Sequence, residues 1–139
     1  MALFEIAGLQ NLRRLSIVRV HQLTDMAVYA LSEHAIRLER LQLSYCDHLS
    51  LEAIHLLLGK LEQLQHLTAT GVPAFRRPGV RRFSDPAPAN IDEEAYFVFN
   101  GENVAGLCAF LDKEEGRRRE AEARNIPFVM RSDDRLDLY

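Results

Sequence analysis

The stretch LERLQLSYCDHLS, residues 38–50, decides the fold, because it recurs along the chain with a period of 26 residues. The upstream copy is NLRRLSIVRVHQLT, residues 11–24, and a third copy begins at Leu64. The apolar positions of the copies correspond one to one: Leu12, Leu15, Ile17, Val20 and Leu23; Leu38, Leu41, Leu43, Cys46 and Leu49; Leu64, Leu67, Ala69, Val72 and Phe75. Since one repeat cannot bury an apolar face alone, the copies are expected to stack around a shared core.

Each copy holds an alternating pattern followed by a helical pattern. Apolar and polar residues alternate with period 2 at the centre of each copy, which predicts a strand. Thr24 and Ser50 then stand where helix N-caps are expected, before helices at about 25–37 and 51–62. The three expected strands span residues 15–17, 41–43 and 67–69. One strand and one helix per repeat predicts a short right-handed α/β solenoid with parallel strands on its concave face.

The composition is that of one soluble globular domain, with 47% hydrophobic and 27% charged residues in a chain of 139. The sequence shows neither a secretory signal nor an apolar run long enough to span a membrane. Cys46 and Cys108 lie in apolar patterns without metal-type spacing, which favours reduced thiols and a cytoplasmic or nuclear protein.

The chain divides into four segments by composition. Residues 1–75 form about three repeats, of which the first is partial, so we expect further repeats upstream in a longer gene product. Residues 76–90 are a connection rich in Pro and Arg, and residues 91–112 are expected to form a helical cap. Within that cap, AYFVF also fits a short strand, but we favour a helix. Residues 113–139 are charged and predict a solvated helical extension that becomes a mobile tail.

The candidate site is the concave sheet face, where the residues between the buried leucines point outward. The 26-residue offset should stack Arg14, Arg40 and His66 into one basic file. The remaining candidate residues are Ser16, Val18, Arg19, Gln42, Ser44, Tyr45, Thr68 and Thr70. Guanidinium groups in such a file would bind carboxylate or phosphate oxygens of a protein partner. The alternative, given equal weight, is that these arginines are solvated and partly paired with Glu39 or Glu62.

Other chemistry is not indicated by the sequence. Cys46 is equivalent to Val20 and Val72, so its thiol should be buried and inert. The histidines show no helical metal-ligand pair, and we find no cofactor motif or catalytic constellation, so an enzyme is not expected. The arginines between the last repeat and the cap more simply form a solvated loop than a nucleic-acid site. These arginines are Arg76, Arg77, Arg81 and Arg82.

The repeat pattern L-x-x-L-x-L-x-x-C-x-x-(L/I)-(S/T) resembles the cysteine-containing, RNI-like leucine-rich repeat of F-box proteins. GVPAFRR, residues 71–77, and FVFNGENVAGLCAFL, residues 97–111, resemble the carboxy-terminal end of fungal F-box proteins of the glucose-repression-resistance type. The resemblance covers roughly residues 9–112 by repeat register.

This resemblance implies a non-catalytic receptor that docks acidic or phosphorylated substrates to an SCF-type ubiquitin ligase for ubiquitin-dependent degradation. Binding of a Skp-family adaptor is expected only if an F-box precedes these repeats, and neither nucleic acid nor membrane is an expected partner. The alternative is a leucine-rich-repeat scaffold or regulatory inhibitor without an F-box, similar to antagonists of mitotic exit.

Overall fold

The computed structural model describes residues 10–129 as a mixed α/β fold with one four-stranded sheet and three α-helices. Two short 3₁₀-helices, η2 and η3, lie in the connection between β3 and β4. The elements are β1 (Arg14–Val18), α2 (Asp25–His34), β2 (Arg40–Ser44), α3 (Leu51–Lys60), β3 (His66–Thr68), η2 (Pro73–Phe75), η3 (Arg81–Phe83), β4 (Val98–Asn100) and α4 (Glu102–Ala123).

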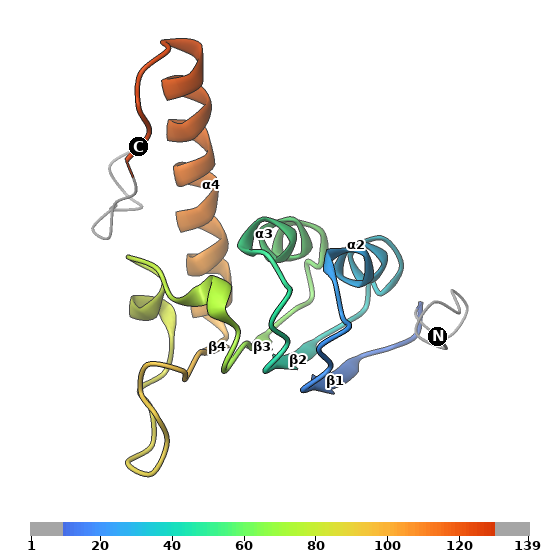
Figure 1. Cartoon of the computed structure of the whole chain (residues 1–139). Helices are drawn as coiled ribbons and strands as arrows, with labels where there is room; N and C mark the ends of the chain where they lie inside the picture. Colours follow the sequence, from blue (N-terminus) through green and yellow to red (C-terminus); the bar gives the residue numbers. More distant parts are fainter. Residues whose placement is uncertain (1–9, 130–139) are drawn as a thin grey trace.

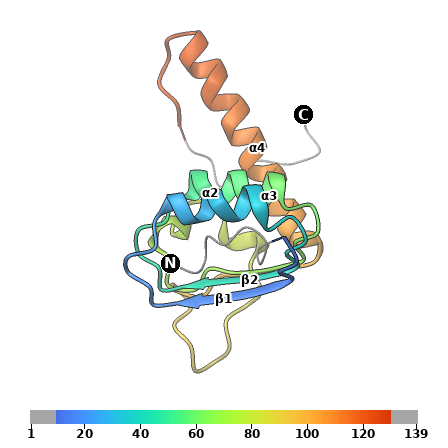
Figure 2. The ribbon, with the colours of Figure 1, turned by 90° about the vertical axis from the view of Figure 1, so that its right-hand side faces the viewer.

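The strands follow one another across the sheet in the order β1, β2, β3, β4. The first three strands are parallel, and their register joins Arg14 to Arg40 and Arg40 to His66. Helices α2 and α3 lie side by side over one face of this sheet, as Figures 1 and 2 show. The predicted strand positions, the 26-residue register and the helices between the strands are therefore confirmed.

The core lies between the sheet and these helices. Leu41, Leu43 and Leu67 on the strands and Ile54 and Leu57 on α3 are fully buried. Burial of each such side chain stabilises the fold by roughly 1.5 to 3 kcal/mol. Cys46 is also fully buried, at the position equivalent to Val20 and Val72, so the prediction of a buried thiol is confirmed.

A left-handed residue ends each of the three parallel strands. Arg19 and Tyr45 have φ values of 58°, and Gly71, at the next 26-residue step, has a φ of 74°. The Tyr45 ring packs directly against Gly71, so a Cβ atom at position 71 would overlap the ring. Glycine is therefore required there both by the backbone conformation and by the close approach of Tyr45.

The two repeat helices begin differently. Ser50 caps α3, because its hydroxyl accepts from the backbone N–H of Ala53 at 3.1 Å. Thr24 is the N-cap residue of α2, as predicted, and has an extended backbone, but its side chain makes no capping hydrogen bond. Asp25 instead accepts from the backbone N–H and the hydroxyl of Ser50, at 2.8 and 2.7 Å. This carboxylate joins the starts of α2 and α3.

The prediction that AYFVF, residues 95–99, forms a helix is wrong. Val98–Asn100 form β4, which pairs antiparallel with β3 and sets Phe99 opposite Leu67. The edge of β3 offers unpaired backbone groups, and Phe97 and Phe99 each stack against Phe75, with ring centroids 5.8 and 5.7 Å apart. Pairing of β4 with β3 buries Phe97 and Phe99. This contact between distant segments of the chain decides for a strand over the helix that we favoured from the local sequence.

Helix α4 covers the β4 end of the sheet. It packs against α3 and β4 and then extends beyond the rest of the fold, as Figure 1 shows. The helix expected from Val104 to Leu111 is present within it, and the helical extension is confirmed as far as Ala123. Predictions for residues 1–9 and 130–139, including the end of the tail, lie outside the described residues. None of the described helices combines the length and apolar character of a membrane span.

Candidate functional site

The outward residues of β1, β2 and β3 line a shallow hollow of about 400 Å³. Arg14 and Arg40 lie side by side along it, since they are register partners in the parallel pair β1 and β2. The residues lining the hollow are Arg14, Leu15, Ser16, Arg40, Leu41, Gln42 and His66. Five of the eleven candidate residues predicted from the sequence are thus brought together on the face opposite the helices.

The two arginines of this hollow have no counter-charge of their own among residues 10–129. Both side chains are exposed, and neither makes a hydrogen bond or ion pair with any residue in the 10–129 range. Glu39, the expected partner, pairs instead with Arg13, with 3.2 Å between the Arg13 Nη1 and Glu39 Oε2 atoms. Two adjacent like charges on neighbouring strands repel by about 0.2 to 1 kcal/mol. A bound anion would convert that repulsion into attraction.

His66 differs from the arginines because both of its ring nitrogens have partners. Nδ1 contacts Asn100 Oδ1, and Nε2 lies 2.8 Å from the Thr68 hydroxyl. The Asn100 amide donates in turn to Asp85 at 2.6 Å, which leaves its oxygen to accept from His66. Within residues 10–129, the members of the predicted file that lack a side-chain partner are therefore Arg14 and Arg40.

Polar side chains along the middle of the sheet form a hydrogen-bonded chain. The Ser16 hydroxyl donates to Gln42 Oε1 at 2.8 Å, and the Gln42 amide donates to the Ser44 hydroxyl at 3.3 Å. Ser44 is buried, whereas Ser16 is exposed and Gln42 is half-buried. This chain holds the Gln42 side chain on the floor of the hollow, two residues from Arg40 along β2 and opposite Ser16 of β1.

The other candidate residues lie at the carboxyl ends of the strands. The Arg19 guanidinium stacks over the Tyr45 ring at 4.7 Å from its centroid, and Val18 is exposed beside them. Thr70 accepts from the backbone N–H of Phe97 at 3.3 Å, so its hydroxyl supports the junction with β4. The side chains of Ser44 and Thr70 are thus engaged within the fold.

Three arginines of the connection after Phe75 are also structural. Arg77 forms an ion pair with Glu114 on α4, and the two side chains are only 10% and 6% exposed. Arg81 donates to the backbone carbonyls of Glu93 and Glu94. Arg82 stacks on Phe83 and Phe110, 4.7 and 5.0 Å from the ring centroids. These contacts engage three of the four arginines of the connection within the fold.

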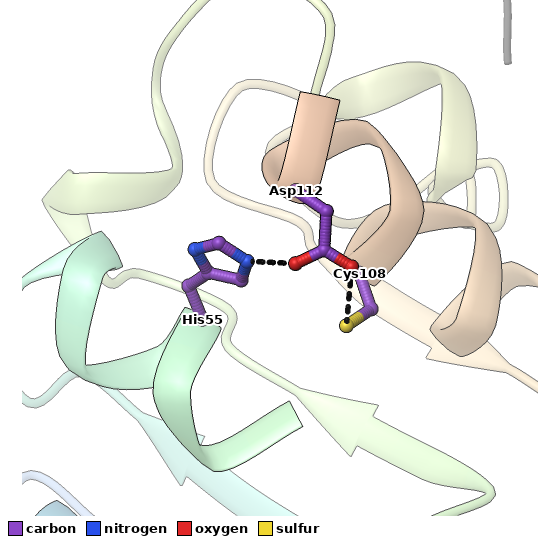
Figure 3. Close-up of side chains that lie close together, drawn as sticks. All are labelled: His55, Cys108 and Asp112. Atoms are coloured by element: carbon purple, nitrogen blue, oxygen red, sulfur yellow. Dashed lines mark hydrogen bonds and ion pairs between the residues drawn. The ribbon is translucent and has the colours of Figure 1, made fainter. Parts of the chain in front are cut away.

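The sequence analysis missed a second group of side chains that carry potential metal-ligand atoms, which Figure 3 shows. His55 on α3 and Cys108 and Asp112 on α4 point toward one another. His55 Nε2 lies 2.6 Å from Asp112 Oδ1, and Cys108 Sγ lies 3.9 Å from Asp112 Oδ2. Cys108 and Asp112 are four residues apart on one helix, which was a usable signal, but nothing in the sequence linked them to His55.

The surroundings of Cys108 disfavour its thiolate. Burial and the nearby negative charge of Asp112 together raise the pKa of the Cys108 thiol to about 11. Burial likewise raises the pKa of Cys46 above its ordinary value. Neither cysteine therefore has the lowered pKa of an activated nucleophile.

A larger groove of about 850 Å³ runs between α3 and α4. Apolar residues such as Leu56 and Leu111 form part of its wall, and charged residues from both helices surround them. His55 and Asp112 lie on this groove, so the histidine, cysteine and aspartate group borders an open space.

No protein-family model matches the chain, and no solved structure matches it. A curated relative, the SCF E3 ubiquitin ligase complex F-box protein pof2 of Schizosaccharomyces pombe, is 35% identical over 116 residues. The match covers 83% of this chain and 23% of that relative. The chain thus spans less than a quarter of the length of the relative it matches. This similarity supports a relationship between the chain and an F-box protein of a ubiquitin ligase complex.

Proposed function

We propose that the chain is a non-catalytic, leucine-rich-repeat binding module of a substrate receptor for an SCF-type ubiquitin ligase. On this proposal the repeats are of the RNI-like, cysteine-containing type, and the open sheet face docks an acidic or phosphorylated segment of a protein substrate. Degradation of that substrate would follow ubiquitination by the assembled ligase. The similarity to an F-box protein over 83% of the chain is one support.

The observation that carries the docking surface is the pair of adjacent, exposed guanidinium groups of Arg14 and Arg40, which have no partner among residues 10–129. Each presents a planar set of N–H donors that fits carboxylate or phosphate oxygens. The hydrogen-bonded Gln42, which lines the same hollow two residues from Arg40, adds polar groups to its floor. An anionic side chain bridging the pair would remove their mutual repulsion and gain charge-assisted hydrogen bonds.

Partners and location form part of the same proposal. The module itself would bind substrate, while a Skp-family adaptor would bind only a gene product that also carries an F-box. Both cysteines in the described chain are free thiols, which agrees with a cytoplasmic or nuclear protein.

The test measures binding of fluorescein-labelled peptide pools containing phosphoserine, glutamate or serine at the central position. The Arg14→Glu/Arg40→Glu double variant should bind the phosphoserine pool at least about 10-fold more weakly, since a hydrogen bond to a charged group contributes roughly 1.5 to 3 kcal/mol. Weak binding of the serine pool by the unmodified chain would show that the anion is recognised.

The matched control is Arg37→Glu/Arg76→Glu, which makes the same charge change at two exposed arginines away from the hollow. Equal losses of peptide affinity in both double variants would mean that net charge alone causes the effect. Unchanged affinity in Arg14→Glu/Arg40→Glu would show that the sheet face is not the docking surface. Circular dichroism verifies that each variant is folded. Co-purification of the full gene product with a Skp-family adaptor distinguishes the receptor from a scaffold without an F-box.

A further inference from the structure

We propose that His55, Cys108 and Asp112 form a binding site for one divalent transition-metal ion, with zinc the best match. This site is independent of the sheet face and of the function proposed for it. The three side chains come from two helices that meet only in the folded protein, α3 and α4. Figure 3 shows the imidazole, the thiol and the carboxylate converging on one point.

The distances suit a single ion. One ligand atom from each residue lies within 4.8 Å of the other two. In a tetrahedral zinc site with Zn–N and Zn–O bonds of about 2.0 to 2.2 Å and a Zn–S bond of about 2.3 Å, ligand atoms lie roughly 3.3 to 3.7 Å apart. The His55 and Asp112 atoms at 2.6 Å would separate slightly, and the Cys108 sulfur would approach. Side-chain rotations supply both movements.

The donor set selects the class of metal. An imidazole nitrogen, a thiolate sulfur and a carboxylate oxygen together are typical zinc ligands. Calcium and magnesium prefer sites made of oxygen atoms, and this site offers one carboxylate and a sulfur. On binding, the Cys108 thiol gives its proton to solvent, and the His55 Nε2 atom must be free of its own proton to coordinate.

Three protein ligands leave a fourth position for water or for a side chain from a partner. Asp112 is 66% exposed and His55 is 22% exposed, and both border the groove between α3 and α4. The fourth position can therefore be reached from outside. Coordination would also link α4 to α3. Bonds from His55 and Asp112 to the metal would replace the hydrogen bond between these two side chains.

The test uses the full 139-residue chain and cobalt(II) as the probe. Titration under reducing conditions should reach saturation at one ion per chain and develop the charge-transfer absorption of a cobalt–thiolate bond. Zinc should displace the cobalt and raise the thermal midpoint of unfolding, because it binds the folded chain preferentially. Cys108→Ser should abolish the charge-transfer band. His55→Gln should weaken zinc binding by at least about 10-fold, because it removes a direct ligand and loss of a residue that only supports a ligand already costs about that much.

The matched control is His21→Gln, because His21 also pairs with an aspartate, Asp47, at 2.8 Å but has no exposed thiol beside it. Asp112→Cys provides a second variant at an exposed position, and it should retain one bound ion and intensify the band. A band that persists in Cys108→Ser, or zinc affinity that falls equally in His21→Gln, would overturn the proposal. Absence of saturable binding in the folded chain would do the same.

Discussion

The arginines of the sheet face and those of the connection after Phe75 have opposite surroundings. Arg14 and Arg40 are exposed, adjacent and unpaired within residues 10–129, whereas Arg77, Arg81 and Arg82 each contact a carboxylate, carbonyl groups or aromatic rings. Residue type alone does not distinguish the two groups. A guanidinium whose donors are satisfied within the fold stabilises it, whereas a guanidinium without a partner is available to a ligand.

The largest expected effect is at the buried ion pair. Glu114→Ala leaves Arg77 buried without a counter-charge and should lower the free energy of unfolding by about 3 to 5 kcal/mol. Urea unfolding followed by circular dichroism measures this change. Glu39→Ala, which removes the partner of the exposed Arg13, should change stability by less than about 0.5 kcal/mol. Similar losses in the two variants would contradict the comparison.

The next largest effect on stability is expected at Gly71, which lies between β3 and the connection after Phe75. Gly71→Ala forces a Cβ atom into the Tyr45 ring at a left-handed backbone position, and should cost about 1 to 3 kcal/mol. Gly59→Ala serves as control, because it lies in α3 with open space around it and should stabilise the chain by up to about 1 kcal/mol. The midpoint of thermal unfolding should shift in opposite directions. A neutral Gly71→Ala variant would mean that the ring can move away.

A smaller effect is expected in the reactivity of the two cysteines. With a pKa of about 11, Cys108 should alkylate slowly at pH 8, where only about one thiol in a thousand is ionised. Asp112→Asn removes the charge that raises this pKa, so labelling of Cys108 by iodoacetamide should become several-fold faster in mass spectrometry. Cys46 should remain unlabelled in the folded chain and react only after denaturation. Faster labelling of Cys46 than of Cys108 would be inconsistent with the described packing.

The smallest effect is expected on the open sheet face. Arg14→Ala and Arg40→Ala should each change the free energy of unfolding by less than about 0.5 kcal/mol, because neither guanidinium has a partner in the part of the chain that the structure describes. Arg77→Ala is the matched substitution in the other region, and it should destabilise the chain by leaving Glu114 buried and unpaired. A large loss at Arg40 would identify it as structural and would weaken the case for a docking surface.

The repeat could be predicted in detail because its information is local and periodic. Leu15, Leu41 and Leu67 recur at one spacing, and that spacing alone fixes which residues pair between neighbouring parallel strands. The basic pair on the outer face follows from the same register. The cap was predicted less well, since the pattern of AYFVF fits both a helix and a strand, and pairing with the edge of β3 decided between them.

The sequence by itself determined the repeat length, the buried apolar positions and the side of the sheet on which Arg14 and Arg40 lie. Only the tertiary structure decided that Arg77 meets Glu114, 37 residues away, and that His55 meets Asp112, 57 residues away. The physical reason is that alternation and helical spacing constrain the direction of a side chain relative to its neighbours in the chain. Which distant side chain it then contacts depends on how α4 packs against α3 and the connection, and no local pattern encodes that packing.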